Sequence, residues 1–69
     1  MSIKIVGEVV RHIFKNSDNN YRVFVVLDQS NNSYTLNGYL VGLDEGLSYE
    51  FICEEVYHAK YGTQYKVLS

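Results

Sequence analysis

Apolar and polar residues alternate along most of this chain, and no long stretch places apolar residues at helical spacing. Five segments alternate in this way or are rich in Val, Ile, Tyr and Phe, the residue types that favour β-strands. These segments are residues 3–14, 21–28, 33–40, 47–58 and 63–68. The pattern predicts an all-β protein with five strands.

Short polar runs between these segments predict tight turns. Residues 16–20 and 29–32 are rich in asparagine, which tolerates left-handed backbone angles and bonds to its own main chain. The two strands that flank residues 29–32 should therefore form an antiparallel hairpin. A last hairpin should turn at residues 60–62, where Gly62 is expected to have a positive φ angle.

The longest predicted strand, residues 3–14, is apolar on both faces. Alternation places Ile3, Ile5, Val9 and Ile13 on one face and Val6, Val10 and Phe14 on the other. This pattern is expected of a strand that bends, here at Gly7, and serves both halves of a small barrel. Five strands joined by hairpins also fit a closed or nearly closed barrel better than an open sheet with unpaired edges. We predict a small five-stranded OB-like barrel with antiparallel hairpins.

Alternation in the other strands predicts which side chains face the core. Residues 21–28 separate into one face with Tyr21, Val23, Val25 and Leu27 and another with Arg22, Phe24, Val26 and Asp28. In strand 47–58, Leu47, Tyr49, Phe51 and Cys53 alternate with Ser48, Glu50 and Glu54, so the acidic face should be solvated. Residues 41–46 are too short for more than one helical turn and should form a loop or a 3₁₀ turn, with Leu43 filling one end of the barrel.

Length and composition limit the chain to one small domain. Its 69 residues can bury a single core, and Cys53 is the only cysteine, so no disulfide can support the fold. Cys53, His12 and His58 are too few ligands for a zinc site. With no secretory leader and no apolar run of transmembrane length, the chain is expected to be cytoplasmic. We predict one domain, residues 1–69, with no cofactor of its own.

Charge is distributed unevenly along the chain. The formal net charge of −2 has the wrong sign for a protein that grips a phosphate backbone unaided. Basic residues gather in the first third of the chain and acidic residues crowd into residues 44–55, so one face could be basic. The alternative is that these charges only keep the surface of the sheet hydrated.

Sequence motifs for catalysis are missing from the chain. No G-x-x-x-x-G-K-[ST] phosphate loop occurs, and the five glycines are dispersed rather than gathered into a dinucleotide fingerprint. Cys53 and His58 would lie roughly 16 Å apart on opposite faces of a strand, too far for a nucleophile pair. Cys53 is instead expected to be a small buried apolar residue. We predict that this chain is not an enzyme.

Seven tyrosines and three phenylalanines give the chain its main candidate for binding chemistry. Aromatic rings interleaved with Lys and Arg can stack on single-stranded bases, each stack contributing about 1–3 kcal/mol. The candidates are Phe14, Arg22, Phe24 and Tyr39. Aromatic residues also favour strands for packing alone, and we interpret Tyr21, Tyr34, Tyr49 and Phe51 as core residues or cross-strand pairs.

The segment from Tyr57 to Tyr65, Tyr-His-Ala-Lys-Tyr-Gly-Thr-Gln-Tyr, has an order that strand chemistry alone does not require. It resembles the H-x-K-Y-G-x-Q-[FY] element of the small N-terminal OB-like domain of the long, RecD-like bacterial DNA helicases. Residues 7–14 and 38–46 are similar to the opening and middle elements of that domain. The motif singles out, as contacts to nucleic acid or to a neighbouring domain, His58, Lys60, Tyr61, Gly62 and Gln64.

The chain departs from this family's usual pattern at several positions. The family usually has glycine at the position of Asn20, proline at those of Val41 and Ala59, and Gly-x-Trp at residues 53–55. Asn20 can still adopt the left-handed angle that a turn glycine supplies. Glu55, in place of the tryptophan, offers no ring for an aromatic contact at that position.

The resemblance implies that the chain is the N-terminal accessory domain of an ATP-dependent 5′–3′ DNA helicase, similar to the exodeoxyribonuclease V alpha subunit, in repair or recombination. ATP and magnesium would be bound by other parts of such a helicase. Two roles stay open for the domain: guiding single-stranded DNA, or docking on its own helicase core as a protein-interaction module that binds no nucleic acid. Neither a membrane nor a small-molecule substrate is expected as a partner.

Overall fold

The computed structural model describes residues 2–69, and all of the regular structure in them is β-strand. The strands are β1 (Ser2–Lys15), β2 (Tyr21–Leu27), β3 (Ser33–Tyr39), β4 (Ser48–His58) and β5 (Gly62–Val67). Their ends agree with the predicted segments to within one residue. The prediction of an all-β protein with five strands is therefore confirmed.

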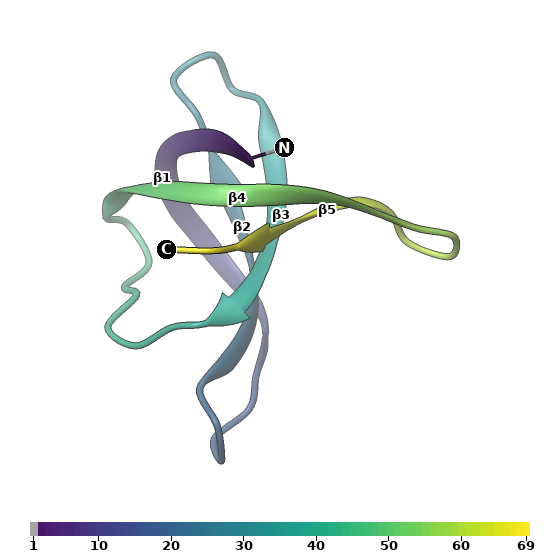
Figure 1. Ribbon diagram of the computed structural model, residues 1–69. Coiled ribbons are helices and arrows are strands. Elements are labelled where there is room, and N and C mark those ends of the chain that lie inside the picture. Colours follow the sequence, from purple (N-terminus) through teal and green to yellow (C-terminus); the bar gives the residue numbers. More distant parts are fainter. Residues whose placement is uncertain (1) are drawn as a thin grey trace.

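The strands close into a barrel in the order β1-β2-β3-β5-β4, as Figure 1 shows. Every pairing is antiparallel except that of β3 with β5, which is short and parallel. β1 belongs to both halves of the barrel, because residues 2–8 pair with β4 and residues 8–15 pair with β2. The predicted closed barrel, with a long first strand shared by both halves, is confirmed.

Gly7 lies where β1 passes from one half of the barrel to the other. A Cβ atom at this position would lie 2.5 Å from the carbonyl oxygen of Leu27 and 2.7 Å from a side-chain carbon of Val26. A residue with a side chain would collide with this backbone, so only glycine lets β1 pass so close to β2.

The core of the barrel combines residues of every strand with one loop residue. The buried cluster and its partly buried neighbours include Ile5, Val9, Phe24, Val26, Leu36, Leu43, Phe51, Cys53, Tyr65 and Val67. Leu43 joins it from the loop between β3 and β4, which is a loop without a helix, as predicted. The Tyr49 hydroxyl holds this loop by accepting from the Asp44 amide at 3.0 Å and donating to the Gly42 carbonyl at 3.3 Å. Burial raises the pKa of the Cys53 thiol, in agreement with its predicted role as a small apolar core residue.

Two irregularities in β1 change which of its residues face the core. The register of β1 with β2 shifts twice, so Val10 and Ile13 are extra residues of β-bulges. His12 consequently turns inward, with its ring centroid 6.1 Å from that of Phe24, while Ile13 is exposed. The prediction that alternation places Ile13 on the same face as Ile5 is therefore wrong.

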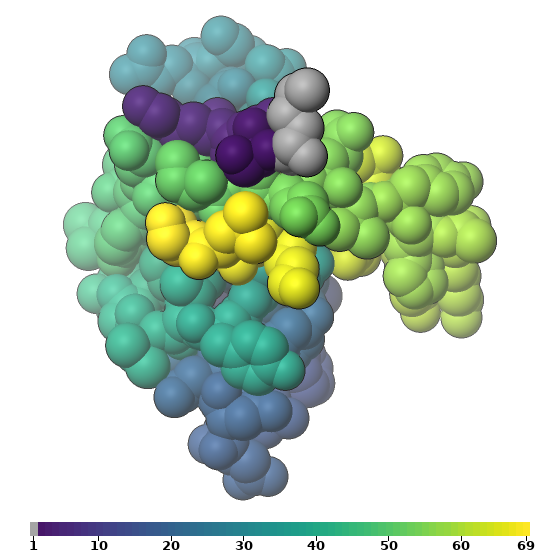
Figure 2. Space-filling view, in the orientation of Figure 1, coloured from purple at the N-terminus to yellow at the C-terminus, as the bar shows by residue number. Residues whose placement is uncertain are grey.

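Both ends of β4 leave the core. Leu47, predicted to face inward, precedes the strand and is exposed, so that prediction is wrong. At the other end, β1 pairs with β4 only as far as Glu54, and the following residues of β4 pair with β5 alone. The hairpin of residues 55–64, named the arm below, stands clear of the barrel in Figures 1 and 2. The predicted acidic face of β4, which includes Glu50 and Glu54, is exposed to solvent.

Candidate nucleic-acid interface

The outer face of β1, β2 and β3 carries the candidate site. Residues directly opposite one another in a sheet point to the same side, so the strand register defines this face. Tyr21 lies opposite Tyr39, and Val23 lies opposite Asn37. These residues alternate along their strands with fully buried residues such as Phe24, so they point away from the interior of the barrel.

Three aromatic side chains form a continuous row across this face. The ring of Tyr21 lies between those of Phe14 and Tyr39, at centroid distances of 6.3 Å and 5.2 Å. The corresponding interplanar angles, 57° and 59°, are those of tilted aromatic pairs in contact. Phe14 is 48% exposed and Tyr39 is 70% exposed, so both ends of the row are accessible. Phe14, Tyr21 and Tyr39 are named the aromatic row below.

The turn between β1 and β2 fixes the row in place. Asn20, immediately before Tyr21, has a φ of 61°, and this confirms that it adopts the left-handed angle expected of a turn glycine. The side-chain oxygen of Asn19 accepts from the Tyr21 amide at 3.1 Å, and that of Asn16 accepts from the Asp18 amide at 2.8 Å. These local bonds preorganise the end of the sheet on which the three rings lie.

Polar and cationic groups flank the aromatic row on the same face. The side-chain amide of Asn37 donates to the Gln64 side-chain oxygen at 3.3 Å and so links β3 to β5. Lys66 lies opposite Asn37, and Arg11 lies opposite Val25, which alternates along β2 with the core residues. The register therefore places both cations on this face. Glu54 lies opposite Lys66 on the next strand and reduces the positive potential there.

Two of the four predicted stacking residues lie away from the aromatic row. Phe24 is fully buried with its ring 5.5 Å from that of Phe51, so the prediction that it stacks on bases is wrong. Arg22 lies opposite Gly38 and alternates with the outward residues, so its side chain lies on the other side of the sheet. The structure therefore brings together Phe14 and Tyr39 but not the complete predicted set.

Tyr21 is the site residue that sequence reasoning placed only among packing residues. Its pairing with Tyr39 confirms the predicted cross-strand role, and the same contact makes it the centre of the row. The sequence feature that indicates this central position is that Tyr21 begins a predicted strand and lies opposite another tyrosine across a predicted hairpin. The packing roles of the other three residues are also confirmed, because Tyr34 packs on Tyr65 and Tyr49 packs on Phe51.

The motif residues of the last hairpin build the tip of the arm. The Nδ1 atom of His58 accepts from the amides of Lys60 and Tyr61 at 3.2 Å and 3.4 Å. The ring of Tyr61 lies 4.8 Å from that of His58 and 5.3 Å from the Lys60 ammonium. Gly62 has a φ of 80°, which confirms the predicted positive angle. Of this set, only Gln64 reaches the outer face of the barrel, through its bond to β3.

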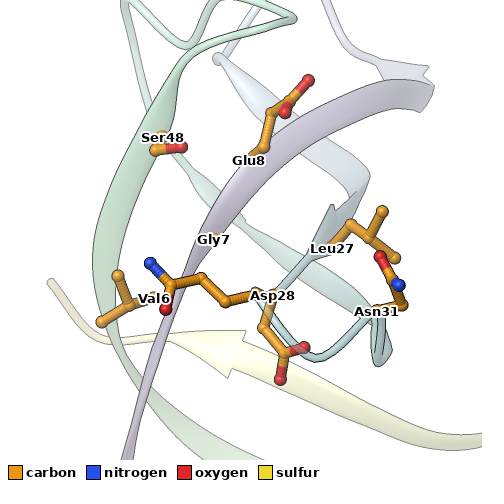
Figure 3. Close-up of a pocket in the computed structure, with 8 residues that line it drawn as sticks. Val6, Gly7, Glu8, Leu27, Asp28, Asn31 and Ser48 are labelled. Carbon is orange, nitrogen blue, oxygen red and sulfur yellow. The ribbon is translucent and has the colours of Figure 1, made fainter.

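A shallow depression of about 300 Å³ lies at the far end of β2 from the aromatic row. It is lined by Val6, Gly7, Glu8, Leu27, Asp28, Gln29, Asn31 and Ser48, most of which Figure 3 labels. The Asp28 carboxylate accepts from the amides of Asn32 and Ser30, and the Asn32 amide above all holds the pKa of Asp28 below its ordinary value. Two carboxylates, Glu8 and Asp28, make this depression unsuitable for a phosphate backbone.

Residues 2–69 contain no group of three His, Cys, Asp or Glu side chains arranged to hold a metal ion. Over the same range, the chain forms no helix of the length and apolarity needed to cross a membrane.

The closed strand order and the first strand shared between two halves define an OB-fold domain. A family model, the OB-fold domain of the ATP-dependent DNA helicase YrrC, matches residues 2–69. The chain belongs to this family of helicase OB-fold domains, and the resemblance stated from the sequence is confirmed. No curated protein and no solved structure matches the chain.

Proposed function

We propose that this chain is the accessory domain of an ATP-dependent, RecD-like 5′–3′ DNA helicase and that it guides single-stranded DNA across the aromatic row. Membership of the helicase OB-fold family supports the accessory role. The observation that carries the DNA contact is the row itself, in which three packed rings lie on one outer face with both ends exposed. Because every base has a π-face, such a row binds a single strand without reading its sequence.

Stacking contributes more than charge to this proposed contact. The net charge of −2 opposes binding to phosphates, and Arg11 and Lys66 are the cations that the register places on the outer face. If both contact phosphates, the logarithm of the binding constant should fall with the logarithm of salt at a slope of about −1.4, a weak dependence for a nucleic-acid-binding protein.

An anisotropy titration of labelled oligo-dT with residues 1–69, at two salt concentrations, tests the proposal. The Tyr39→Ala variant should bind about 5- to 140-fold more weakly, because each base stack contributes about 1–3 kcal/mol. Its fold should be intact, since Tyr39 is exposed. Absence of binding by the wild type at millimolar protein, or equal binding by the variant, would refute the DNA contact.

The arm favours a second role, docking on the helicase core. Val56, Tyr57 and Tyr61 are exposed apolar or aromatic residues on a hairpin that stands clear of the barrel, as Figure 2 shows. In this proposal the domain acts in the cytoplasm, in DNA repair or recombination, beside a core that binds ATP and magnesium. The chain itself contains no phosphate loop, so no step of ATP hydrolysis is assigned to its residues.

A further inference from the structure

Within residues 2–69, neither strand edge of the arm pairs with another strand. β4 pairs with β1 only up to Glu54, and β5 pairs with β3 only at Tyr65 and Lys66. Across residues 2–69, the strands of the arm therefore pair only with each other. Free edges of this kind can accept another strand through main-chain hydrogen bonds.

Both faces of the arm also expose apolar side chains. Val56 lies opposite Gln64 on one face, and Tyr57, which is 75% exposed, lies on the opposite face. A two-stranded ribbon is marginally stable in water unless a third strand or another element covers it. The exposed apolar side chains of the arm are therefore typical of a surface that a partner covers.

Charge favours a protein segment over nucleic acid as that partner. Glu54 and Glu55 are exposed at the base of the arm, and among the described residues neither forms a salt bridge. Lys66 lies opposite Glu54, but no salt bridge joins the two among the described residues. Lys60, at the tip of the arm, lies over the ring of Tyr61. Carboxylates repel phosphates and attract Lys or Arg, so an extended peptide segment with a basic residue beside an apolar one fits the arm.

We infer that the arm docks on the helicase core of its own polypeptide by strand addition, with an extended basic segment of the core pairing along the β4 edge at residues 55–58. This inference rests on the proposed helicase role but does not require the aromatic row to bind DNA. The arm is preorganised for such pairing, because His58 and Gly62 shape its tip and Gln64 ties its base to β3. Preorganisation lowers the entropy cost of docking.

Amide hydrogen exchange tests strand addition directly, because it measures protection of main-chain N–H groups. Exchange of residues 55–58 is compared between the isolated chain, residues 1–69, and the intact helicase. Outward-pointing amides of these residues should exchange at least about tenfold more slowly in the intact helicase. Unchanged exchange in the arm would overturn the inference, even if side chains of the arm contacted the core.

A matched pair of variants separates this inference from DNA binding. Tyr57 and Tyr39 are 75% and 70% exposed, so Tyr57→Ala and Tyr39→Ala remove similar rings from the arm and from the row. In the intact helicase, Tyr57→Ala should reduce the protection about tenfold, as loss of an aromatic contact at an interface does, and Tyr39→Ala should leave it unchanged. Equal protection in both variants would contradict the inference.

Two further controls identify other occupants of the arm. Protection that rises with the concentration of the isolated chain would show that a second copy pairs with the arm. Protection that appears on addition of oligo-dT would show that nucleic acid covers it. Either result overturns docking on the core, whereas a failure of Tyr39→Ala to weaken DNA binding counts only against the aromatic row.

Discussion

The arm continues two strands of the barrel, β4 and β5, but the side chains of these strands lie in opposite environments in the barrel and in the arm. Phe51 and Cys53 of β4 are buried in the core, whereas Val56 and Tyr57, only a few residues further along the strand, are exposed. The pairing explains this difference, because within residues 2–69 β1 covers β4 only as far as Glu54. A strand that is continuous in sequence thus changes from a core element to a free ribbon where its neighbour ends.

The largest expected effect contrasts the core of the barrel with the arm. Phe24→Ala removes a fully buried ring that packs on Phe51 and should lower the free energy of unfolding by about 3–5 kcal/mol. Tyr57→Ala removes an exposed ring and should change it by less than about 0.5 kcal/mol. Urea unfolding followed by circular dichroism measures both values. Similar losses in the two variants would show that the arm is packed in the isolated chain.

Glycine substitutions give the next largest contrast. Gly7→Ala forces a Cβ atom to within 2.5 Å of a backbone oxygen and should cost about 2–3 kcal/mol. Gly62→Ala meets no atom within 4 Å, so it should cost only the strain of a left-handed φ, about 1–2 kcal/mol. The thermal unfolding midpoints of the two variants show which substitution costs more stability. A greater loss for Gly62→Ala than for Gly7→Ala would argue against the close crossing of β1 and β2.

The smallest expected effect is a pH dependence at the loop between β2 and β3. The Asn32 amide, followed by the other donors around Asp28, lowers the pKa of this carboxyl below its ordinary value of 3.8. Because the pKa is lower in the folded than in the unfolded chain, Asp28 stabilises the fold above the unfolded value, and this stabilisation is lost as pH falls through the folded value. The Asp28→Asn variant should lose less stability than the wild type as the pH falls, because it has no carboxylate at this position to protonate. Urea unfolding midpoints of the wild type and of Asp28→Asn are measured from pH 6 to pH 2. Midpoints that fall in parallel in the two proteins would contradict the stabilising role of the Asp28 carboxylate.

Local chemistry was sufficient to predict several features of the fold from the sequence. The asparagine-rich turns and the alternating strands place the hairpins correctly, and the positive φ angles of Asn20 and Gly62 follow from what these residue types tolerate. Gly7 was likewise expected at the bend, although the contact that requires glycine comes from another strand. Each of these features depends on a few neighbouring residues.

Other features depend on tertiary structure that alternation does not contain. Both faces of β2 are apolar, so its pattern could not show that Phe24, rather than Tyr21, faces the core. The two bulges in β1 interrupt the alternation that placed Ile13 on the face of Ile5. The projection of the arm depends on where β1 stops covering β4, and the residues of the arm themselves carry no sign of it.

We propose that this domain holds single-stranded DNA on the aromatic row and keeps the arm free for protein contacts. The most direct measurement is the affinity of residues 1–69 for oligo-dT in the wild type, Tyr39→Ala and Tyr57→Ala. We expect Tyr39→Ala to weaken binding about 5- to 140-fold and Tyr57→Ala to leave it unchanged. Equal weakening by the two variants, or no measurable binding by the wild type, would contradict the claim.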